Sequence, residues 1–223
     1  MSKQREAPAE AMKITIIYDN ITRDRRLGAD WGFACLVEAS GRKILFDTGA
    51  NGNILINNMK YLNIRPAEIT DIFISHDHWD HIGGLPAVIG LTRCSCFIPE
   101  TFLPQQDLPT VQVGRSPQQL HDGIWSTGTL AGIEQSLVLK QGEQVAVVAG
   151  CSHPGVEAIL KAAGSAGKVS ALIGGLHGFD NFEVLDGLSL VCPTHCTQHI
   201  NEIRRRYSTI YVDGGAGSIL NIG

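Results

Sequence analysis

Three imidazoles and two carboxylates fall within six consecutive residues, which read His76-Asp77-His78-Trp79-Asp80-His81. In an extended loop, alternate residues such as His76 and His78 point to the same side. Asp80 and His81 come just past a bend and can face a second position. Nitrogen and oxygen ligands of this kind suit borderline-soft divalent metals. The spacing therefore predicts a metal centre.

The opposing interpretation is a polar surface loop in which histidines cluster by chance. The chain has eight histidines in 223 residues, and three of them stand in this stretch. So dense a group favours metal binding. Gly83 and Gly84 follow the motif, and we expect them to let the chain turn sharply into the next helix without a Cβ clash.

Four apolar strands are expected to end just before a histidine. These histidines are His76, His153, His177 and His195. Active sites of α/β sheets lie outside the carboxyl ends of such strands, and strand ends on one edge share a rim. We therefore expect the four histidines to meet at one edge, held there by rigid strands.

The remaining pattern alternates strands and helices along the chain. Apolar residues at helical spacing predict three helices, marked by Leu55 and Met59, by Ile159 and Ala163, and by Ile200 and Ile203. Further strands are expected at 13–18, 33–39, 43–46, 138–139 and 211–212. A stretch rich in Pro, Gln and Gly predicts a long loop at 99–123, near the site. Residues 1–12 are expected to form a flexible tail before a single domain at 13–223.

Composition excludes several classes of protein. Hydrophobic residues make up 43% of the chain and charged residues 18%, which is ordinary for a globular protein with a sizeable core. The net charge of −4 argues against a general nucleic-acid binder, and the run Arg204–Arg206 is best interpreted as a solvated helix face. No apolar run approaches the ~20 residues that span a bilayer. We expect a cytoplasmic protein with no membrane or nucleic-acid partner and leave its oligomeric state open.

All six cysteines are expected to be free thiols, as in a cytosolic chain of this size. Cys151 and Cys196 stand close to two of the strand-end histidines. A soft metal ligand is one interpretation of either residue, and a buried thiol beside the site is the favoured one.

The metal motif resembles the signature of the metallo-β-lactamase superfamily, His-x-His-x-Asp-His. The resemblance runs from Lys13 onward and includes Phe46-Asp47-Thr48-Gly49 and the histidines at 153 and 195. It implies a four-layer αββα sandwich of two similar halves, with two divalent metal ions at one edge. Zn²⁺ is the expected metal, with Fe or Mn as alternatives.

The same resemblance implies the ligands. One ion would be held by His76, His78 and His153, and the other by Asp80, His81 and His195. Asp47 would support the metal loop by hydrogen bonds without binding an ion.

The chain departs from the superfamily at the fourth motif, where an aspartate usually bridges both ions. Here the strand ends in Gly174-Gly175-Leu176-His177. Either His177 replaces the bridge, or a hydroxide alone links the ions, or the second ion is weakly held. Occupancy of the second site is therefore left open.

The segments Gly-Cys-Ser-His-Pro-Gly, Gly-Gly-Leu-His and Pro-Thr-His-Cys-Thr are similar to one branch of the superfamily. That branch contains 7,8-dihydropterin-6-ylmethyl-4-(β-D-ribofuranosyl)aminobenzene 5′-phosphate synthase, which joins a pterin methyl diphosphate to an aminobenzene ribose phosphate. The resemblance implies either hydrolysis by a metal-bound hydroxide or metal-assisted displacement of diphosphate.

We therefore expect a metal-dependent enzyme acting on a small phosphorylated, aromatic or heterocyclic metabolite. Asp80 and His177 are the predicted catalytic residues, and His199 is either a substrate contact or a plain helix histidine. An imidazole in place of the bridging carboxylate makes the site more positive by one unit, which favours phosphate. The alternatives are an RNA-processing nuclease of the superfamily and a hydrolase of a neutral ester or lactone.

Overall fold

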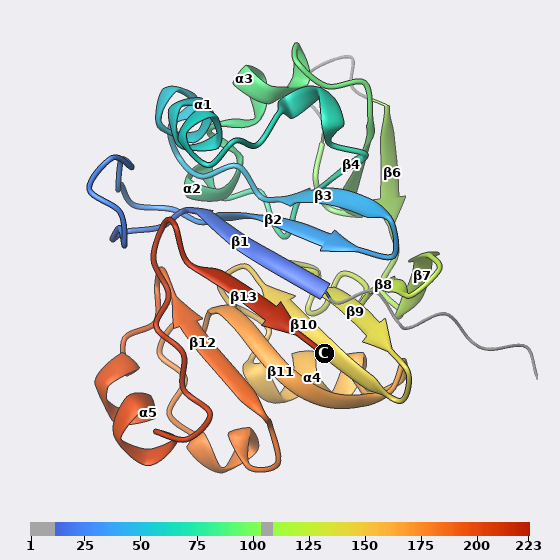
Figure 1. The fold of residues 1–223 in the computed structure, drawn as a ribbon. Coiled ribbons are helices and arrows are strands. Elements are labelled where there is room, and N and C mark those ends of the chain that lie inside the picture. Colours follow the sequence, from blue (N-terminus) through green and yellow to red (C-terminus); the bar gives the residue numbers. More distant parts are fainter. Residues whose placement is uncertain (1–11, 104–108) are drawn as a thin grey trace, which may run out of the picture.

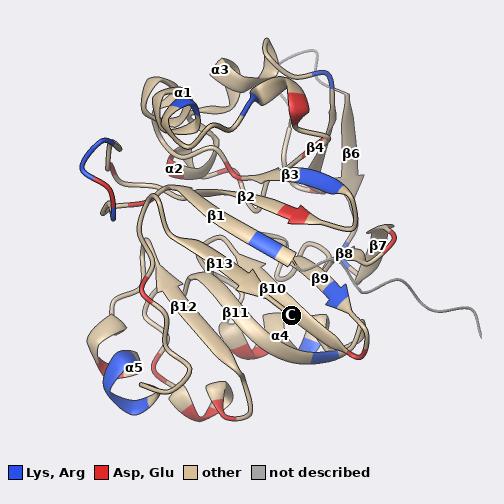
Figure 2. Ribbon diagram, viewed as in Figure 1, with Lys and Arg blue, Asp and Glu red and all other residues tan. Residues whose placement is uncertain are grey.

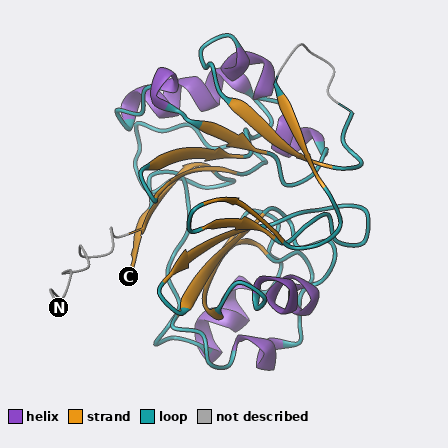
Figure 3. Cartoon of the chain, turned by 90° about the vertical axis from the view of Figure 1, so that its right-hand side faces the viewer, coloured by secondary structure: helices purple, strands orange, loops and turns teal. Residues whose placement is uncertain are grey.

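Two β-sheets pack face to face, and helices cover both outer faces (Figures 1 and 3). The computed structural model describes residues 12–103 and 109–223. The central strands of each sheet are buried on both faces, so they are apolar runs rather than alternating ones. The architecture is the predicted four-layer αββα sandwich.

The first sheet has seven strands in the order β13-β1-β2-β3-β4-β5-β6. β3 to β6 run parallel to one another, and the remaining neighbours are antiparallel. Its strands are β1 Met12–Tyr18, β2 Ala34–Ala39, β3 Arg42–Phe46, β4 Asp71–Phe73, β5 Ser95–Pro99, β6 Thr110–Val113 and β13 Ile219–Ile222. Its outer face is covered by α1 Gly52–Tyr61 and α3 Leu85–Ile89, with the short α2 Trp79–Ile82 between them in the chain.

The second sheet has six strands in the order β12-β11-β10-β9-β8-β7, and β10, β11 and β12 are parallel. The strands are β7 Gln118–His121, β8 Ile124–Ser126, β9 Leu137–Gln141, β10 Gln144–Ala149, β11 Lys168–Gly175 and β12 Leu190–Thr194. α4 Val156–Ala163 and α5 Ile200–Arg206 lie on its outer face. Two 3-10 helices complete the described elements, at Pro66–Glu68 and Phe182–Leu185.

Three buried clusters fill the three interfaces between the four layers. In β10, Ala146 and Val148 face the other sheet, whereas Val145 and Val147 face α4. This alternation is the period of two that a strand imposes on its side chains. The central cluster locks the two halves together and thereby fixes the edge at which their strand ends meet.

The structure corrects the loop predicted at 99–123. The stretch 99–123 is not one long loop, since β6 and β7 lie within it as edge strands of the two sheets. Edge strands pair on one side only, so their exposed polar residues gave no apolar pattern. Residues 104–108 lie outside the described residues.

The chain termini also differ from the expectation. The last strand is β13, whereas 211–212 contributes only a single bridge between Val191 and Tyr211. β1 begins at Met12, which pairs with Ile222 and therefore belongs to the sheet rather than to the predicted tail. Residues 1–11 of that tail lie outside the described residues.

Lys and Arg positions are scattered along the ribbon of both halves, among Asp and Glu positions (Figure 2). Each arginine of the α5 run has an acidic partner. Arg204 pairs with Asp213, and Arg205 and Arg206 both pair with Glu202. Among the helices of the described segments, none has the length and apolar character needed to cross a bilayer.

The glycines after the metal motif are required by close packing rather than by a special turn. Gly83 and Gly84 have ordinary helical φ values of −60° and −83°. A Cβ on Gly84 would lie 2.2 Å from the carbonyl oxygen of Thr48, and one on Gly83 would lie 2.2 Å from that of Ala50. The motif loop therefore packs directly against the backbone that follows Asp47.

This packing predicts the effect of adding one methyl group. We expect Gly84→Ala to destabilise the protein by about 1–3 kcal/mol, because the clash is with backbone that cannot rotate away. Gly90→Ala is the matched control, since its Cβ would meet nothing within 4 Å and its φ is −69°. Denaturant unfolding of both variants measures the difference. Equal stabilities would contradict the packing argument.

Candidate metal centre

The six predicted ligands come from the loops after β4, β10 and β12 and from the short helix α2, and they converge at one edge of the sandwich. The rings of His76, His78 and His153 are in mutual contact, with centroids 4.4, 4.7 and 4.8 Å apart. The loops after β4 and β10 belong to different sheets. This first group is therefore assembled across the interface between the two halves.

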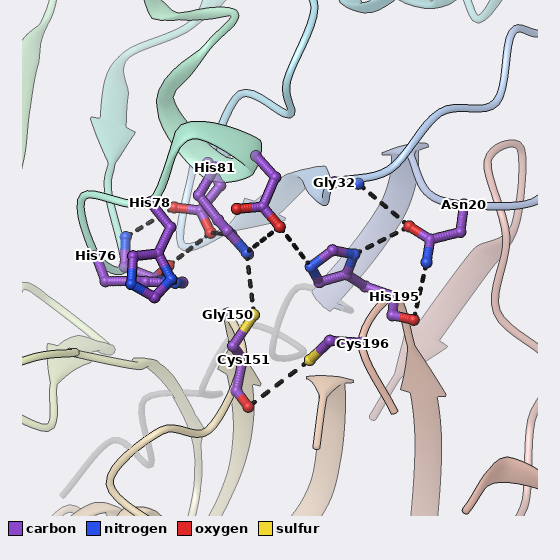
Figure 4. Close-up of polar contacts among 12 residues, drawn as sticks. Asn20, Gly32, His76, His78, His81, Gly150, Cys151, His195 and Cys196 are labelled. Carbon is purple, nitrogen blue, oxygen red and sulfur yellow. Dashed lines mark hydrogen bonds and ion pairs between the residues drawn. The ribbon is translucent and has the colours of Figure 1, made fainter. Parts of the chain in front are cut away.

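The other three predicted ligands form a second group beside the first (Figure 4). Oδ2 of Asp80 lies 3.2 Å from Nε2 of His195 and 3.9 Å from Nε2 of His81. The rings of His76 and His81 are 4.2 Å apart, which joins the two groups. The sequence motif thus folds into two adjacent sets of donor atoms.

The protonation states of His76, His81 and Asp80 suit a divalent cation, whereas the hydrogen bond with Glu134 raises the pKa of His153. Burial, together with neighbouring imidazoles, lowers the pKa of His76 and of His81 to about 3. Burial opposes ionisation of Asp80, but His195 and His81 hold the pKa of this carboxylate below its usual range. Neutral imidazoles and an ionised carboxylate are the ligand forms of both side chains.

One buried atom of this set has no partner of its own. Nε2 of His195 is buried and, among the described residues, has no hydrogen-bond partner of good geometry, although the Asp80 carboxylate lies 3.2 Å away. Buried polar atoms are rarely left in this state. A cation between His195, Asp80 and His81 would satisfy it, so the donor set fits a divalent metal ion.

Asp47 lies beneath the metal loop and holds it from below. Its Oδ1 accepts the backbone N–H of Ser75 at 2.7 Å, and its Oδ2 accepts the Ser75 hydroxyl at 2.7 Å. Oδ2 also lies 2.7 Å from Nδ1 of His81. An Nδ1–H that donates to this carboxylate leaves Nε2 of His81 free to bind metal. Burial raises the pKa of Asp47 to about 7, an effect that the nearby His76 opposes.

In the second half of the molecule, Glu134 holds the loop that carries His153 by hydrogen bonds, as Asp47 holds the metal loop. No sequence pattern predicted this role. The fully buried carboxylate precedes β9. Its Oε1 accepts the backbone N–H groups of residues 150, 151 and 152 at 3.0–3.1 Å. Its Oε2 lies 2.9 Å from both the backbone nitrogen and Nδ1 of His153. Burial opposes ionisation, but these hydrogen bonds lower the pKa of Glu134 to about 2.

Asp19 and Asn20, after β1, orient the third loop and were also missed. Asp19 accepts the backbone N–H of His195 at 3.1 Å, and the Asn20 amide nitrogen donates to the His195 carbonyl at 3.0 Å. Oδ1 of Asn20 lies 3.0 Å from Nδ1 of His195 (Figure 4). Polar residues after a strand would have been the only signal in the sequence.

Backbone strain is concentrated around the same edge. Asp47, Ser152, His177 and His195 all have φ between 47° and 60°. This left-handed region is costly for residues other than glycine and persists where surrounding structure holds it. Here it turns the chain sharply as each strand ends and directs the side chains into the site.

The two remaining candidates differ in position. The exposed His177 lies at the rim, with its ring 5.2 Å from that of His153, and one of its nitrogens groups with the sulfurs of Cys151 and Cys196. His199 is exposed at the start of α5, where its ring contacts Phe182, and it joins none of the ligand groups of the described residues.

Comparison with known proteins places this geometry in a family. The model of the metallo-beta-lactamase superfamily matches residues 29–151, more than half of the chain. The chain belongs to the metallo-β-lactamase superfamily. Members of this superfamily are mostly metal-dependent hydrolases that bind divalent metals such as zinc. The sequence-based family and fold predictions are confirmed.

Individual members of the superfamily resemble the chain to different extents. It is 26% identical to a 7,8-dihydropterin-6-methyl-4-(β-D-ribofuranosyl)-aminobenzene-5′-phosphate synthase of Methanocaldococcus jannaschii, over 74% of this chain and 79% of that one. A ribonuclease Z of Nanoarchaeum equitans is 43% identical, over only 24% of this chain and 16% of its own. The crystal structure of Tm1679, a metal-dependent hydrolase of the superfamily, superposes with a TM-score of 0.75 at 21% identity, covering 95% and 99% of the two chains.

The role of Glu134 can be tested by one isosteric substitution. In Glu134→Gln the amide oxygen can keep the three backbone N–H groups, which turns its NH₂ group toward His153. That NH₂ would donate to Nδ1 and move the ring proton to Nε2, which then cannot bind metal. We expect metal affinity to fall 10–100-fold, as for other groups that orient a ligand.

Glu157→Gln is the matched control, because it removes the same charge from an exposed residue of α4. Zinc titration against a chelator of known affinity gives the dissociation constants. A Glu134→Gln variant that is folded and binds zinc like the control would show that Glu134 does not set the tautomer of His153.

Proposed function

We propose that this member of the superfamily is a metal-dependent enzyme that acts on a small phosphorylated, aromatic or heterocyclic metabolite at a binuclear centre. The observation that carries the proposal is that two groups of donor side chains meet at one edge of the sandwich, with His177 at the rim. One ion would be held by His76, His78 and His153, and the other by Asp80, His81 and His195. Two such ions supply Lewis acidity toward a phosphoryl or carbonyl oxygen and make water nucleophilic at neutral pH.

Asp80 and His177 would act on the reacting groups. The Asp80 side chain is 10% exposed, so an ionised oxygen at the floor of the site can accept a hydrogen bond from the attacking water and orient it. His177 is exposed beside His153 and can donate an N–H to a phosphate oxygen, which the usual carboxylate cannot do. The same two groups serve hydrolysis and diphosphate displacement, because both reactions develop charge on phosphate oxygens.

Two tryptophans support an aromatic or heterocyclic substrate. Trp31 is 49% exposed and stands edge-on to the His195 ring at 5.1 Å. Trp79 is 64% exposed and follows His78 directly. Exposed aromatic faces beside polar groups are suited to bind a flat ring. The name of the methanogen relative, a synthase of a pterin-containing phosphate, agrees with such a substrate.

A nuclease is the weaker candidate. The match to ribonuclease Z covers only a short segment of each chain. The arginine run on α5 is occupied by ion pairs with Glu202 and Asp213, which leaves no obvious basic groove for a nucleic-acid backbone there. We therefore keep a small molecule as the proposed substrate, with zinc as the metal.

Inhibition by inorganic phosphate tests the substrate class. We expect a panel of phosphorylated aromatic compounds to give activity that requires added metal, and phosphate or pyrophosphate to inhibit it competitively. His177→Asp should raise the inhibition constant about tenfold or more, since a hydrogen bond to a charged group is lost and repulsion is added.

His199→Asp provides the control, because it makes the same substitution at an exposed histidine outside the ligand groups. The variant should be inhibited like the natural protein. If phosphate binds the His177 variant as tightly as the control, or if only neutral esters and lactones react, the proposed substrate class is wrong.

A further inference from the structure

The sulfur of Cys151 is a member of all three groups of potential ligand atoms in the described residues, one of which it forms with His177 and Cys196. It belongs to a group with His76 and His153 and to another with His81 and His195. Within each group all ligand atoms lie within 4.8 Å of one another. His76 and His153 are proposed ligands of one ion, and His81 and His195 are proposed ligands of the other. The sulfur therefore lies between the two donor sets.

The position of Cys151 is fixed by its backbone. It follows β10 by two residues, is 3% exposed, and donates its backbone N–H to Oε1 of Glu134 at 3.0 Å. Figure 4 shows its sulfur pointing toward His81, whose Nε2 lies 3.1 Å away. The carboxylate that orients His153 thus also holds the loop that carries this sulfur.

We propose that Cys151 is a ligand of the metal centre and that its thiolate bridges the two ions. This inference rests on the binuclear site proposed above and adds a seventh, sulfur ligand to it. Zinc bonds of about 2.0–2.1 Å to nitrogen and 2.3 Å to sulfur, at a tetrahedral angle, place the two atoms about 3.6 Å apart. The sulfur-to-nitrogen distances, from 3.1 Å to at most 4.8 Å, reach this value by small movements. On binding, the thiol releases its proton to solvent.

A bridging thiolate accounts for the missing aspartate of the fourth motif. It supplies one negative charge between the ions, as the carboxylate would have done. His177 then remains free at the rim, and the preference for phosphate depends on its N–H donor rather than on an extra positive charge. Sulfur ligation also favours Zn²⁺ or Fe²⁺ over Mg²⁺ and Mn²⁺.

Two observations separate this role from that of an ordinary buried thiol. His195 shares a ligand group with the Cys151 sulfur, and its buried Nε2 has no hydrogen-bond partner of good geometry among the described residues, although Asp80 lies 3.2 Å away, as expected if one cation contacts all three residues. Cys196 shows the contrast. Its sulfur lies 3.8 Å from the Cys151 carbonyl oxygen and forms a group with His177 and the Cys151 sulfur, but it shares no group with any of the six other proposed ligands.

Spectroscopy of cobalt-substituted protein tests the proposal directly. Co²⁺ bound to a thiolate gives an intense sulfur-to-metal charge-transfer band in the near ultraviolet. We expect this band in the natural protein, its loss in Cys151→Ser and its retention in the matched variant Cys196→Ser. A band that survives in Cys151→Ser, or that disappears only in Cys196→Ser, would overturn the assignment.

X-ray absorption of the zinc-loaded natural protein needs no variant and covers the case in which Cys151→Ser does not fold. The proposal predicts a sulfur shell at about 2.3 Å around zinc. Metal content measured on the same sample separates the two claims. Two zinc ions with a nitrogen and oxygen shell alone would overturn the thiolate bridge and leave the proposed function standing. A sample that takes up no metal would overturn both.

Discussion

The metal centre depends on two buried carboxylates, one in each half of the molecule. Asp47 and Glu134 are both fully buried, and each accepts backbone N–H groups from a loop that carries ligands. Each also contacts Nδ1 of a histidine, His81 or His153, and so directs Nε2 into the site. Burying the ionised Glu134 carboxylate costs several kcal/mol, which only a full set of charge-assisted hydrogen bonds can offset. The benefit is that the buried carboxylates hold the metal-binding nitrogen atoms in position before a metal ion binds.

The layered fold makes this arrangement possible. Parallel strands bring β10, β11 and β12 to a common edge, and the central core between the sheets aligns that edge with the end of β4. Ligands on separate loops are thereby held by rigid strands rather than by one another. Close contact between the metal loop and the backbone beside Asp47, which Gly83 and Gly84 permit, completes the support.

The fold and the assembled histidines could be predicted from the sequence because their signals are local. Apolar runs mark the strands, and His76, His153 and His195 follow them directly. The supporting groups gave no such signal. Glu134 acts on residues 150–153, and Asn20 acts on His195, 175 positions away. A polar residue in a loop is usually solvated, so only the folded chain reveals these partners.

The surroundings of Cys151 likewise could not be predicted from the sequence. In the sequence Cys151 stands close to a strand-end histidine, and a buried thiol beside the site is favoured there over a soft metal ligand. The fold places its sulfur within reach of four histidines from two sheets. The missing aspartate and this sulfur are related only in space, since His177 occupies the sequence position of the former.

We expect two ions to occupy the two donor groups. Anomalous diffraction at the zinc edge from crystals of the zinc-loaded protein tests this expectation most directly. Two peaks should appear about 3.5–4 Å apart. One should lie within bonding distance of His76, His78 and His153, and the other within bonding distance of Asp80, His81 and His195. A single peak, or peaks away from these residues, would contradict it.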